Sequence, residues 1–199
     1  MLMNMKELLK VADEKGFAVP AFNIGSDQLL KAVMQQVKEM KSPVILEMSP
    51  DEFNFVENSL VQSMIYEASK TDVPVVIHLD HGDKYETVVR AIQAGFTSVM
   101  IDASSKSFED NIAVTKQVVE YAHAHGVVVE AELGTLAGIE DEVVVESGHE
   151  SYTRPEEVEE FVDRTGCDSL AIAIGTSHGA YKFTPDQCTR NADGILVPP

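Results

Sequence analysis

Short runs of consecutive apolar residues alternate with amphipathic stretches along this chain. Six runs are short and rich in Val and Ile, which is typical of strands buried on both faces of a sheet. They cover residues 17–22, 44–47, 75–79, 98–101, 127–130 and 170–174. Between them, apolar residues recur at helical spacing, as at Leu29, Val33 and Val37. The pattern predicts helices over residues 28–40, 59–70, 85–94, 109–124 and 156–164.

This alternation of strands and helices predicts an α/β fold made of parallel βαβ units. An open doubly wound sheet and a closed barrel both fit it. No GxGxxG turn follows the first run, which disfavours a dinucleotide-binding fold. Polar residues follow several of the runs, and a site that draws on many strand ends favours the barrel.

The expected fold is a (β/α)8 barrel of the TIM-barrel type that is incomplete. Such a barrel has eight strands and typically about 250 residues, whereas this chain has 199 residues and six predicted units. Strands seven and eight are therefore expected to be missing. We predict one partial barrel domain over residues 1–199, in which the tail at 182–199 does not continue the pattern.

Composition limits the classes of partner. The chain carries 15 basic and 33 acidic residues, a net charge of −18, which disfavours a nucleic-acid partner because phosphate backbones require clustered Lys and Arg. We expect no nucleic-acid partner. No apolar stretch is long enough for a membrane span, and the first residues lack the features of a signal peptide. We therefore expect a cytoplasmic protein in which Cys167 and Cys188 are reduced and structural.

Two histidines and an aspartate stand at the end of one predicted strand. The apolar run that begins at Val75 leads into His78, Asp80 and His81. One histidine here would more often cap a turn than bind a metal. However, histidine is the commonest metal ligand, and a neighbouring carboxylate can act as a base. The group therefore predicts a metal or acid–base site.

A second segment carries three glutamates. Alternation along a strand places Glu130 and Glu132 on the same side, where two carboxylates are costly without a cation or hydrogen-bond donors. The Gly-rich stretch that leads to Glu140 is long for a βα connection, which favours an active-site lid over an acidic surface loop. After the last run, His178 offers an imidazole from a different strand, and Gly179 allows close approach of a ligand.

Together these motifs resemble the class II, metal-dependent fructose-bisphosphate and tagatose-bisphosphate aldolases. The resemblance covers residues 8–181 and includes the segments 19–23, 42–46, 99–102 and 108–112. It implies a lyase of carbohydrate metabolism that performs a reversible retro-aldol cleavage of a ketose 1,6-bisphosphate. The products would be dihydroxyacetone phosphate and an aldehyde phosphate. A metal serves as the electron sink in this family, so no Schiff-base lysine is required.

The resemblance also implies which residues bind the metal. His81 and His178 correspond to two zinc ligands of the family, and Asp102 and Glu132 to a pair that supports the site or holds an alternative metal. The expected cofactor is Zn²⁺, with a second divalent or monovalent cation as an addition to it.

The remaining roles concern the substrate. By the same resemblance, Asp80 corresponds to the carboxylate that handles the proton of the C4 hydroxyl, and Glu140 to the lid residue that exchanges a proton with the enediolate carbon. Asn23, Ser49 and Gly179 correspond to substrate-binding positions, the last two near phosphate groups. The expected ligand is a phosphorylated sugar.

The chain departs from the family pattern after His178, because no further histidine follows to act as the third zinc ligand. A catalytic zinc usually has three protein ligands. The alternative function is thus a catalytically impaired member of the family that binds metal weakly or assembles with another chain. An unrelated β/α binding module is a third hypothesis. Open sheet edges at 17–22 and 170–174 predict a homo-oligomer.

Overall fold

Six parallel strands form the single large sheet of the structure, a computed structural model that describes residues 1–136, 138–140, 143–145, 151–175, 184, 186, 188–190 and 196–197. The strands lie in the order β1-β2-β3-β4-β5-β8. Their bounds are β1 Ala21–Asn23, β2 Val44–Met48, β3 Val75–Gly82, β4 Ser98–Ile101, β5 Val128–Leu133 and β8 Ser169–Ile172.

This strand order decides between the two predicted architectures. A doubly wound sheet reverses its strand order at a switch point, whereas here each strand pairs in parallel with the next strand of the sheet along the chain. The sheet is therefore a partial β/α barrel, as predicted, and β1 and β8 are its two edges.

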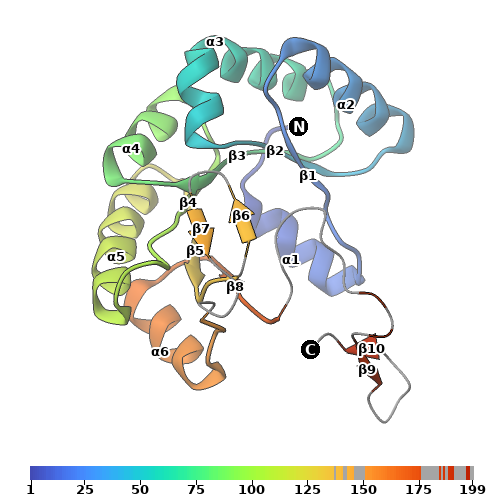
Figure 1. Cartoon of the computed structure of the whole chain (residues 1–199). Helices are drawn as coiled ribbons and strands as arrows, with labels where there is room; N and C mark the ends of the chain where they lie inside the picture. Colours follow the sequence, from blue (N-terminus) through green and yellow to red (C-terminus); the bar gives the residue numbers. More distant parts are fainter. Residues whose placement is uncertain are drawn as a thin grey trace.

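Of the six helices in the described residues, five line the convex side of the sheet and one lies on its concave side (Figure 1). The outer helices are α2 Asp27–Met40, α3 Pro50–Ser69, α4 Tyr85–Ala94, α5 Phe108–Ala124 and α6 Pro155–Thr165. The inner helix is α1, Met5–Lys15. None of the described helices is both long and apolar enough to cross a lipid bilayer.

Side chains alternate between the two faces of the sheet, so that a separate hydrophobic core lies on each face. In β3, Val75, Ile77 and Leu79 belong to the large core beneath the outer helices, whereas Val76 packs in a smaller core with residues of α1. The smaller core consists of Met5, Leu8, Ile45, Val76 and Val128. Because side chains alternate between faces, the same rows continue on the concave face as Glu47, His78 and Glu130. The amino-terminal half of that face is thus apolar and covered by α1, and the next layer is polar.

Two predicted elements begin at other residues in the structure, and one helix was not predicted. Helix α3 begins at Pro50, not at residue 59, because Ser49 and Glu52 form a capping box and proline is well placed in a first turn. The first strand begins at Ala21, not at residue 17, because α1 extends to Lys15 and ends at Gly16 in the left-handed conformation. Helix α1 itself was not predicted.

Two short antiparallel pairs of strands are described outside the main sheet. Strands β6 (Gly138–Glu140) and β7 (Val143–Val145) pair antiparallel within the predicted lid. Strands β9 (Thr189–Arg190) and β10 (Leu196–Val197) pair in the same way in the tail. The lid segment therefore carries secondary structure of its own.

Candidate metal and acid–base site

An irregularity in β3 brings His81 to the site. His78 and Leu79 pair with Ser98 and Val99 of β4, but the next pair is Gly82 with Ile101, so that Asp80 and His81 both stand opposite one residue. His81 has a φ of 46°, a left-handed conformation that is uncommon for a non-glycine residue. Simple alternation would send Asp80 and His81 to opposite faces, whereas this bulge brings their side chains together, with Oδ1 of Asp80 4.0 Å from Nε2 of His81.

Gly82 makes the bulge sterically feasible. A Cβ atom at this position would lie 2.2 Å from the carbonyl oxygen of Met100 in β4, a separation that no side chain tolerates. The absence of a side chain lets the two strands pair again directly after the bulge. Gly82, which directly follows His81, therefore holds this histidine in place through the backbone.

His81, Asp102 and Glu132 come together from the ends of β3, β4 and β5. The Nδ1 atom of His81 lies 3.2 Å from Oδ2 of Asp102 and 4.0 Å from Oε2 of Glu132. One ligand atom from each residue falls within 4.8 Å of the other two. Two ligands on a tetrahedral zinc lie roughly 3.4 Å apart, given metal–ligand bonds of about 2.1 Å. The separations and the imidazole–carboxylate donor set therefore fit a divalent cation.

Hydrogen bonds keep Asp102 ionised. Burial by itself would raise the pKa of this carboxyl group, but hydrogen bonds from His81 and from Ser104 outweigh burial and lower it. The Ser104 backbone N–H donates to Oδ1 at 2.9 Å, while Oδ2 faces the imidazole. The carboxylate is therefore charged and oriented towards His81, as a metal ligand or a partner of one must be.

Asp80 lies beside this group. Its Oδ1 atom is 4.0 Å from Nε2 of His81, and about a quarter of its side chain is exposed. A carboxylate that is partly exposed and close to a candidate metal ligand can reach a proton on a bound ligand. The structure thus brings four of the predicted residues together, namely Asp80, His81, Asp102 and Glu132.

A polar network lies one layer deeper on the concave face. His78 is fully buried, with Nδ1 at 2.9 Å from the Ser98 hydroxyl and Nε2 at 3.5 Å from Oε2 of Glu130. Burial, with a smaller effect of His81, lowers the pKa of His78 to about 3. His78 is therefore neutral, and it links β3 to β4 and β5.

Two glutamates on this layer have strongly raised pKa values. Burial, reinforced by Asp80 and Glu130, raises the pKa of Glu47 to about 8. Burial and Asp80 raise the pKa of Glu130 to about 7. The concave face therefore concentrates carboxyl groups whose charged forms are mutually unfavourable, and a cation bound beside them would favour those charged forms.

Asn23 and Ser49 meet at Glu52, near the ends of β1 and β2. The Glu52 Oε2 atom accepts hydrogen bonds from Nδ2 of Asn23 at 3.3 Å and from the backbone N–H of Ser49 at 2.9 Å. The Glu52 N–H donates to the Ser49 hydroxyl at 3.4 Å. These two predicted substrate-binding residues therefore lie together and share an acidic neighbour.

Some predicted residues cannot be placed. His178 and Gly179 lie outside the described residues, and for Glu140 only the backbone, in β6, is described. Conversely, Glu47 and Glu52 were not singled out from the sequence. The Ser49–Glu52 spacing of a capping box was the available signal for Glu52, and a charged residue ending an apolar strand was the signal for Glu47.

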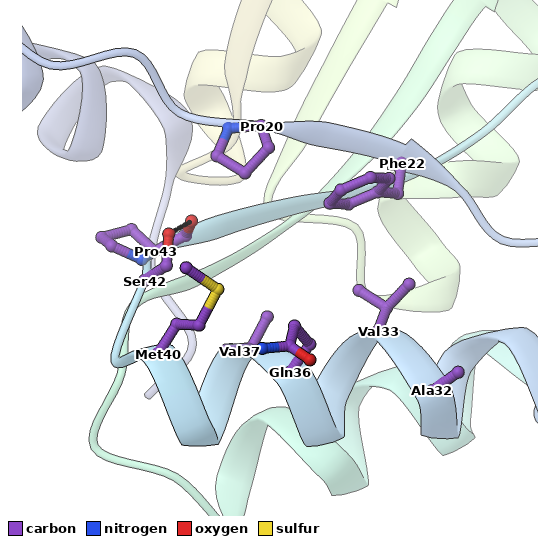
Figure 2. Close-up of a pocket in the computed structure, with 9 residues that line it drawn as sticks. All are labelled: Pro20, Phe22, Ala32, Val33, Gln36, Val37, Met40, Ser42 and Pro43. Carbon is purple, nitrogen blue, oxygen red and sulfur yellow. Dashed lines mark hydrogen bonds between the residues drawn. The ribbon is translucent and has the colours of Figure 1, made fainter.

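An apolar groove of about 340 Å³ lies apart from these polar groups, between β1 and α2. Figure 2 shows Pro20 and Phe22 on one side, facing Val33, Val37 and Met40 of α2 on the other. Phe22 and Met40 are 45% and 67% exposed. The groove is a feature of the open sheet edge and contains none of the residues of the candidate site.

Comparison with known proteins identifies the family of this chain. A family model described as fructose-bisphosphate aldolase class-II matches residues 3–192. The fructose-bisphosphate aldolase of Treponema pallidum is 49% identical, over all of this chain and 61% of its own length. That of Thermus caldophilus is 50% identical, over 92% of this chain and 60% of its own length. The chain thus spans about three-fifths of the length of these relatives.

A solved structure shows the same fold. The crystal structure of the YdjI aldolase from Escherichia coli K12 superposes with a TM-score of 0.77 at 37% identity, covering 88% of this chain and 62% of that one. The family match covers most of the chain and includes the strand ends that carry His81, Asp102 and Glu132. The chain therefore belongs to the class II fructose-bisphosphate aldolase family, whose members are lyases.

Proposed function

We propose that this chain carries the metal-dependent site of an aldolase that cleaves a ketose phosphate reversibly, with a ketose 1,6-bisphosphate as the substrate that the family implies. The observation that carries the proposal is the convergence of His81, Asp102 and Glu132 from three strand ends, with Asp80 beside them. His81, Asp102 and Glu132 would hold Zn²⁺, with His178 as a further ligand. Bound there, the cation would polarise the C2 carbonyl of the ketose.

The protein groups would then move the protons. Asp80 takes the proton of the C4 hydroxyl as the C3–C4 bond breaks, which turns C4 into the aldehyde carbon of one product. The electron pair of that bond passes towards the C2 oxygen of the dihydroxyacetone phosphate half. Glu140 returns a proton to C3 and completes that product. Asn23, Ser49 and Gly179 would position the substrate.

The test is cleavage of fructose 1,6-bisphosphate by the purified chain. Metal-free protein should be inactive, added Zn²⁺ should restore release of dihydroxyacetone phosphate, and Asp80→Ala should lower the rate at least 100-fold. Asp83→Asn is the matched control, because this neighbouring aspartate pairs with Lys84 and should have little effect. Cleavage that persists in a chelator would contradict the proposal.

A second candidate function is metal binding without turnover. It is favoured by the candidate metal group itself, because ligand atoms of His81, Asp102 and Glu132 within 4.8 Å of one another can hold a cation whether or not turnover follows. It predicts that zinc binds and that His81→Ala weakens binding, while no ketose bisphosphate is cleaved. Zinc-dependent cleavage would exclude it.

We further infer that the chain forms a homo-oligomer. The edges β1 and β8 have no strand partner on their outer sides in the described sheet, and such edges pair readily with other chains. Exposed apolar side chains lie at both, namely Phe22 at β1 and Ile172 and Ile174 at β8. Light scattering after size-exclusion chromatography should give a mass above 21.8 kDa, and a stable monomer across concentrations would contradict the inference.

A further inference from the structure

The end of β5, where Glu132 lies, extends past its neighbour β4. The last pair between these two strands joins Ile101 to Ala131, whereas β5 pairs with β8 as far as Leu133 and Ile172. Backbone groups beyond the last pair need other hydrogen-bond partners, because an unpaired carbonyl or N–H group inside the protein is costly. At this end of β5, two side chains from outside the sheet supply such partners.

Asn111 of α5 binds the backbone of Glu132 directly. Its Nδ2 atom donates to the Glu132 carbonyl oxygen at 2.9 Å, and its Oδ1 atom accepts from the Thr115 hydroxyl group at 3.1 Å. Asn111 and Thr115 are both buried, and the amide of Asn111 is oriented so that its donor and its acceptor are each paired. Helix α5 thereby holds the residue that offers a carboxylate to the candidate metal group.

Thr153, which lies two residues before α6, joins the ends of β5 and β8. Its hydroxyl group donates to the Leu133 carbonyl and accepts from the Ala173 N–H at 2.8 Å. Its own N–H group donates to the Ala173 carbonyl at 3.0 Å. These contacts continue the link between the two strands directly past their last pair, Leu133 with Ile172. Thr153 therefore fixes the backbone one residue after Glu132.

The chain that follows Leu133 lies directly against the segment around Thr153. A Cβ atom added at Gly134 would lie 2.7 Å from the Ser151 carbonyl oxygen and 2.8 Å from Oγ1 of Thr153, which is closer than side chains approach. Gly134 also has a φ of +88°, a left-handed conformation that glycine adopts without strain. This close approach is independent of the hydrogen bonds, and it shows that the end of β5 is held tightly.

A metal ligand needs such support. Oε2 of Glu132 lies 4.0 Å from Nδ1 of His81, and groups of a functional site must stay within about 0.5 Å of their productive positions. We propose that Asn111 and Thr153 are positioning residues of the metal site: they fix the backbone at Glu132 and so keep its carboxylate within reach of a cation held by His81 and Asp102. The inference rests on the metal site of the proposed function and adds two residues that act through Glu132.

The experiment removes the Thr153 hydroxyl group and measures zinc affinity by competition with a chromophoric chelator. Thr153→Val keeps the shape of the side chain without the hydroxyl group. It should weaken zinc binding by about tenfold, the lower end of the range for residues that orient a metal ligand. Thr153→Ser restores a hydroxyl group and should bind zinc as the unmodified chain does. Tyr152→Phe is the matched control, because it removes a hydroxyl group from the neighbouring exposed residue and should leave the affinity unchanged.

A double-mutant cycle separates positioning from a general loss of stability. Glu132→Gln alone should weaken zinc binding, and adding Thr153→Val to it should cause little further loss, because Thr153 acts through the Glu132 carboxylate. Asn111→Leu should show the same dependence on Glu132. The inference would be overturned by unchanged affinity in Thr153→Val, by unchanged affinity in Glu132→Gln, or by a loss from Thr153→Val that is as large with Gln at position 132 as with Glu.

The proposed function is tested separately, by zinc-dependent cleavage of fructose 1,6-bisphosphate by the unmodified chain. Losses of zinc affinity that depend on Glu132, without any cleavage, would support the positioning role and contradict the aldolase activity. Cleavage by a chain whose zinc affinity does not depend on Thr153 would support the activity and contradict the positioning role. An unmodified chain that binds no zinc would overturn both.

Discussion

The imidazole of His81 and the carboxylate of Asp102 face each other across the step from β3 to β4, with Nδ1 and Oδ2 3.2 Å apart. Asp102 either binds a metal directly or orients the His81 imidazole that binds it. In both cases Asp102 affects the same metal site. Metal ligands and their hydrogen-bonded partners both contribute strongly to affinity. This pair is therefore the most sensitive point at which to test the metal site.

We predict that Asp102→Asn weakens zinc binding by about 10- to 100-fold, the range typical for the partner of a metal-bound histidine. Competition with a chromophoric chelator gives the dissociation constant. His125→Asn is the control, because this exposed histidine bonds to the Tyr121 carbonyl at the end of α5. The zinc affinity of the His125→Asn variant should equal that of the unmodified chain. Equal affinity in Asp102→Asn would remove Asp102 from the site.

Gly82→Ala should destabilise the fold as well as the site. Its Cβ atom would meet the Met100 carbonyl oxygen at 2.2 Å, so β3 and β4 must separate locally. Overpacking of this kind typically costs about 1–3 kcal/mol. Gly126→Ala is the control for backbone strain alone, since Gly126 has a φ of +73° with no atom near its missing side chain. Urea unfolding should show the larger loss for Gly82→Ala, and equal losses would contradict the steric argument.

Glu47→Gln should stabilise the metal-free protein at high pH. The folded-state pKa of Glu47 is raised to about 8 by burial and by its acidic neighbours, so the folded protein holds this proton more tightly than the unfolded chain. Ionisation of Glu47 therefore lowers the free energy of unfolding. This loss is absent below pH 4.5, grows as the pH rises, and reaches its full size above pH 8. Each pKa unit corresponds to about 1.4 kcal/mol, and partial exposure reduces the total to roughly 1–3 kcal/mol.

Urea unfolding in a chelator at pH 5 and at pH 9 checks this. The difference in unfolding free energy between Glu47→Gln and the unmodified chain should be larger at pH 9. Glu39→Gln removes a carboxylate from the exposed surface of α2 and should show no such dependence. The opposite dependence for Glu47→Gln would mean that Glu47 is charged and favourably paired in the folded state.

Asp168→Ala should loosen the attachment of α1. The Asp168 carboxylate accepts from Lys6 of α1 at 2.8 Å, from Nε2 of His123 at 2.7 Å and from the Val129 N–H at 2.9 Å. Its removal leaves the Val129 N–H without this acceptor, which typically costs about 1–3 kcal/mol. Hydrogen exchange should become faster in α1, and Asp163→Ala on the exposed side of α6 should not change it. Unchanged exchange in Asp168→Ala would contradict this anchor.

Much of the fold follows from local sequence. The helix predicted over residues 85–94 has those bounds in the structure, because apolar residues recur on one face and Gly95 ends it. Helix α3 was predicted nine residues short at its start, since the stabilising signal there is a pair of polar capping residues and not an apolar one. Helix α1 was missed because its amphipathic face is small and its role, covering the concave core, depends on the sheet.

The site was predictable in its chemistry but not in its geometry. The residue types of the segments 78–82 and 130–134 indicate ligands and a base. Alternation along β3, however, would have separated Asp80 from His81, and only the bulge and the left-handed backbone at His81 bring them together. Glu52 is a second example. Its capping role is visible in the sequence, but its contacts with Asn23 and Ser49 depend on the folded β1–β2 edge.

The polar layer on the concave face has a consequence for calorimetry. Glu47 and Glu130, with pKa values of about 8 and 7, are partly protonated at neutral pH, and a nearby divalent cation favours their charged forms. Uptake of the cation would then expel protons into the buffer. The observed heat of metal binding should accordingly vary with the ionisation enthalpy of the buffer, even though neither glutamate needs to touch the ion.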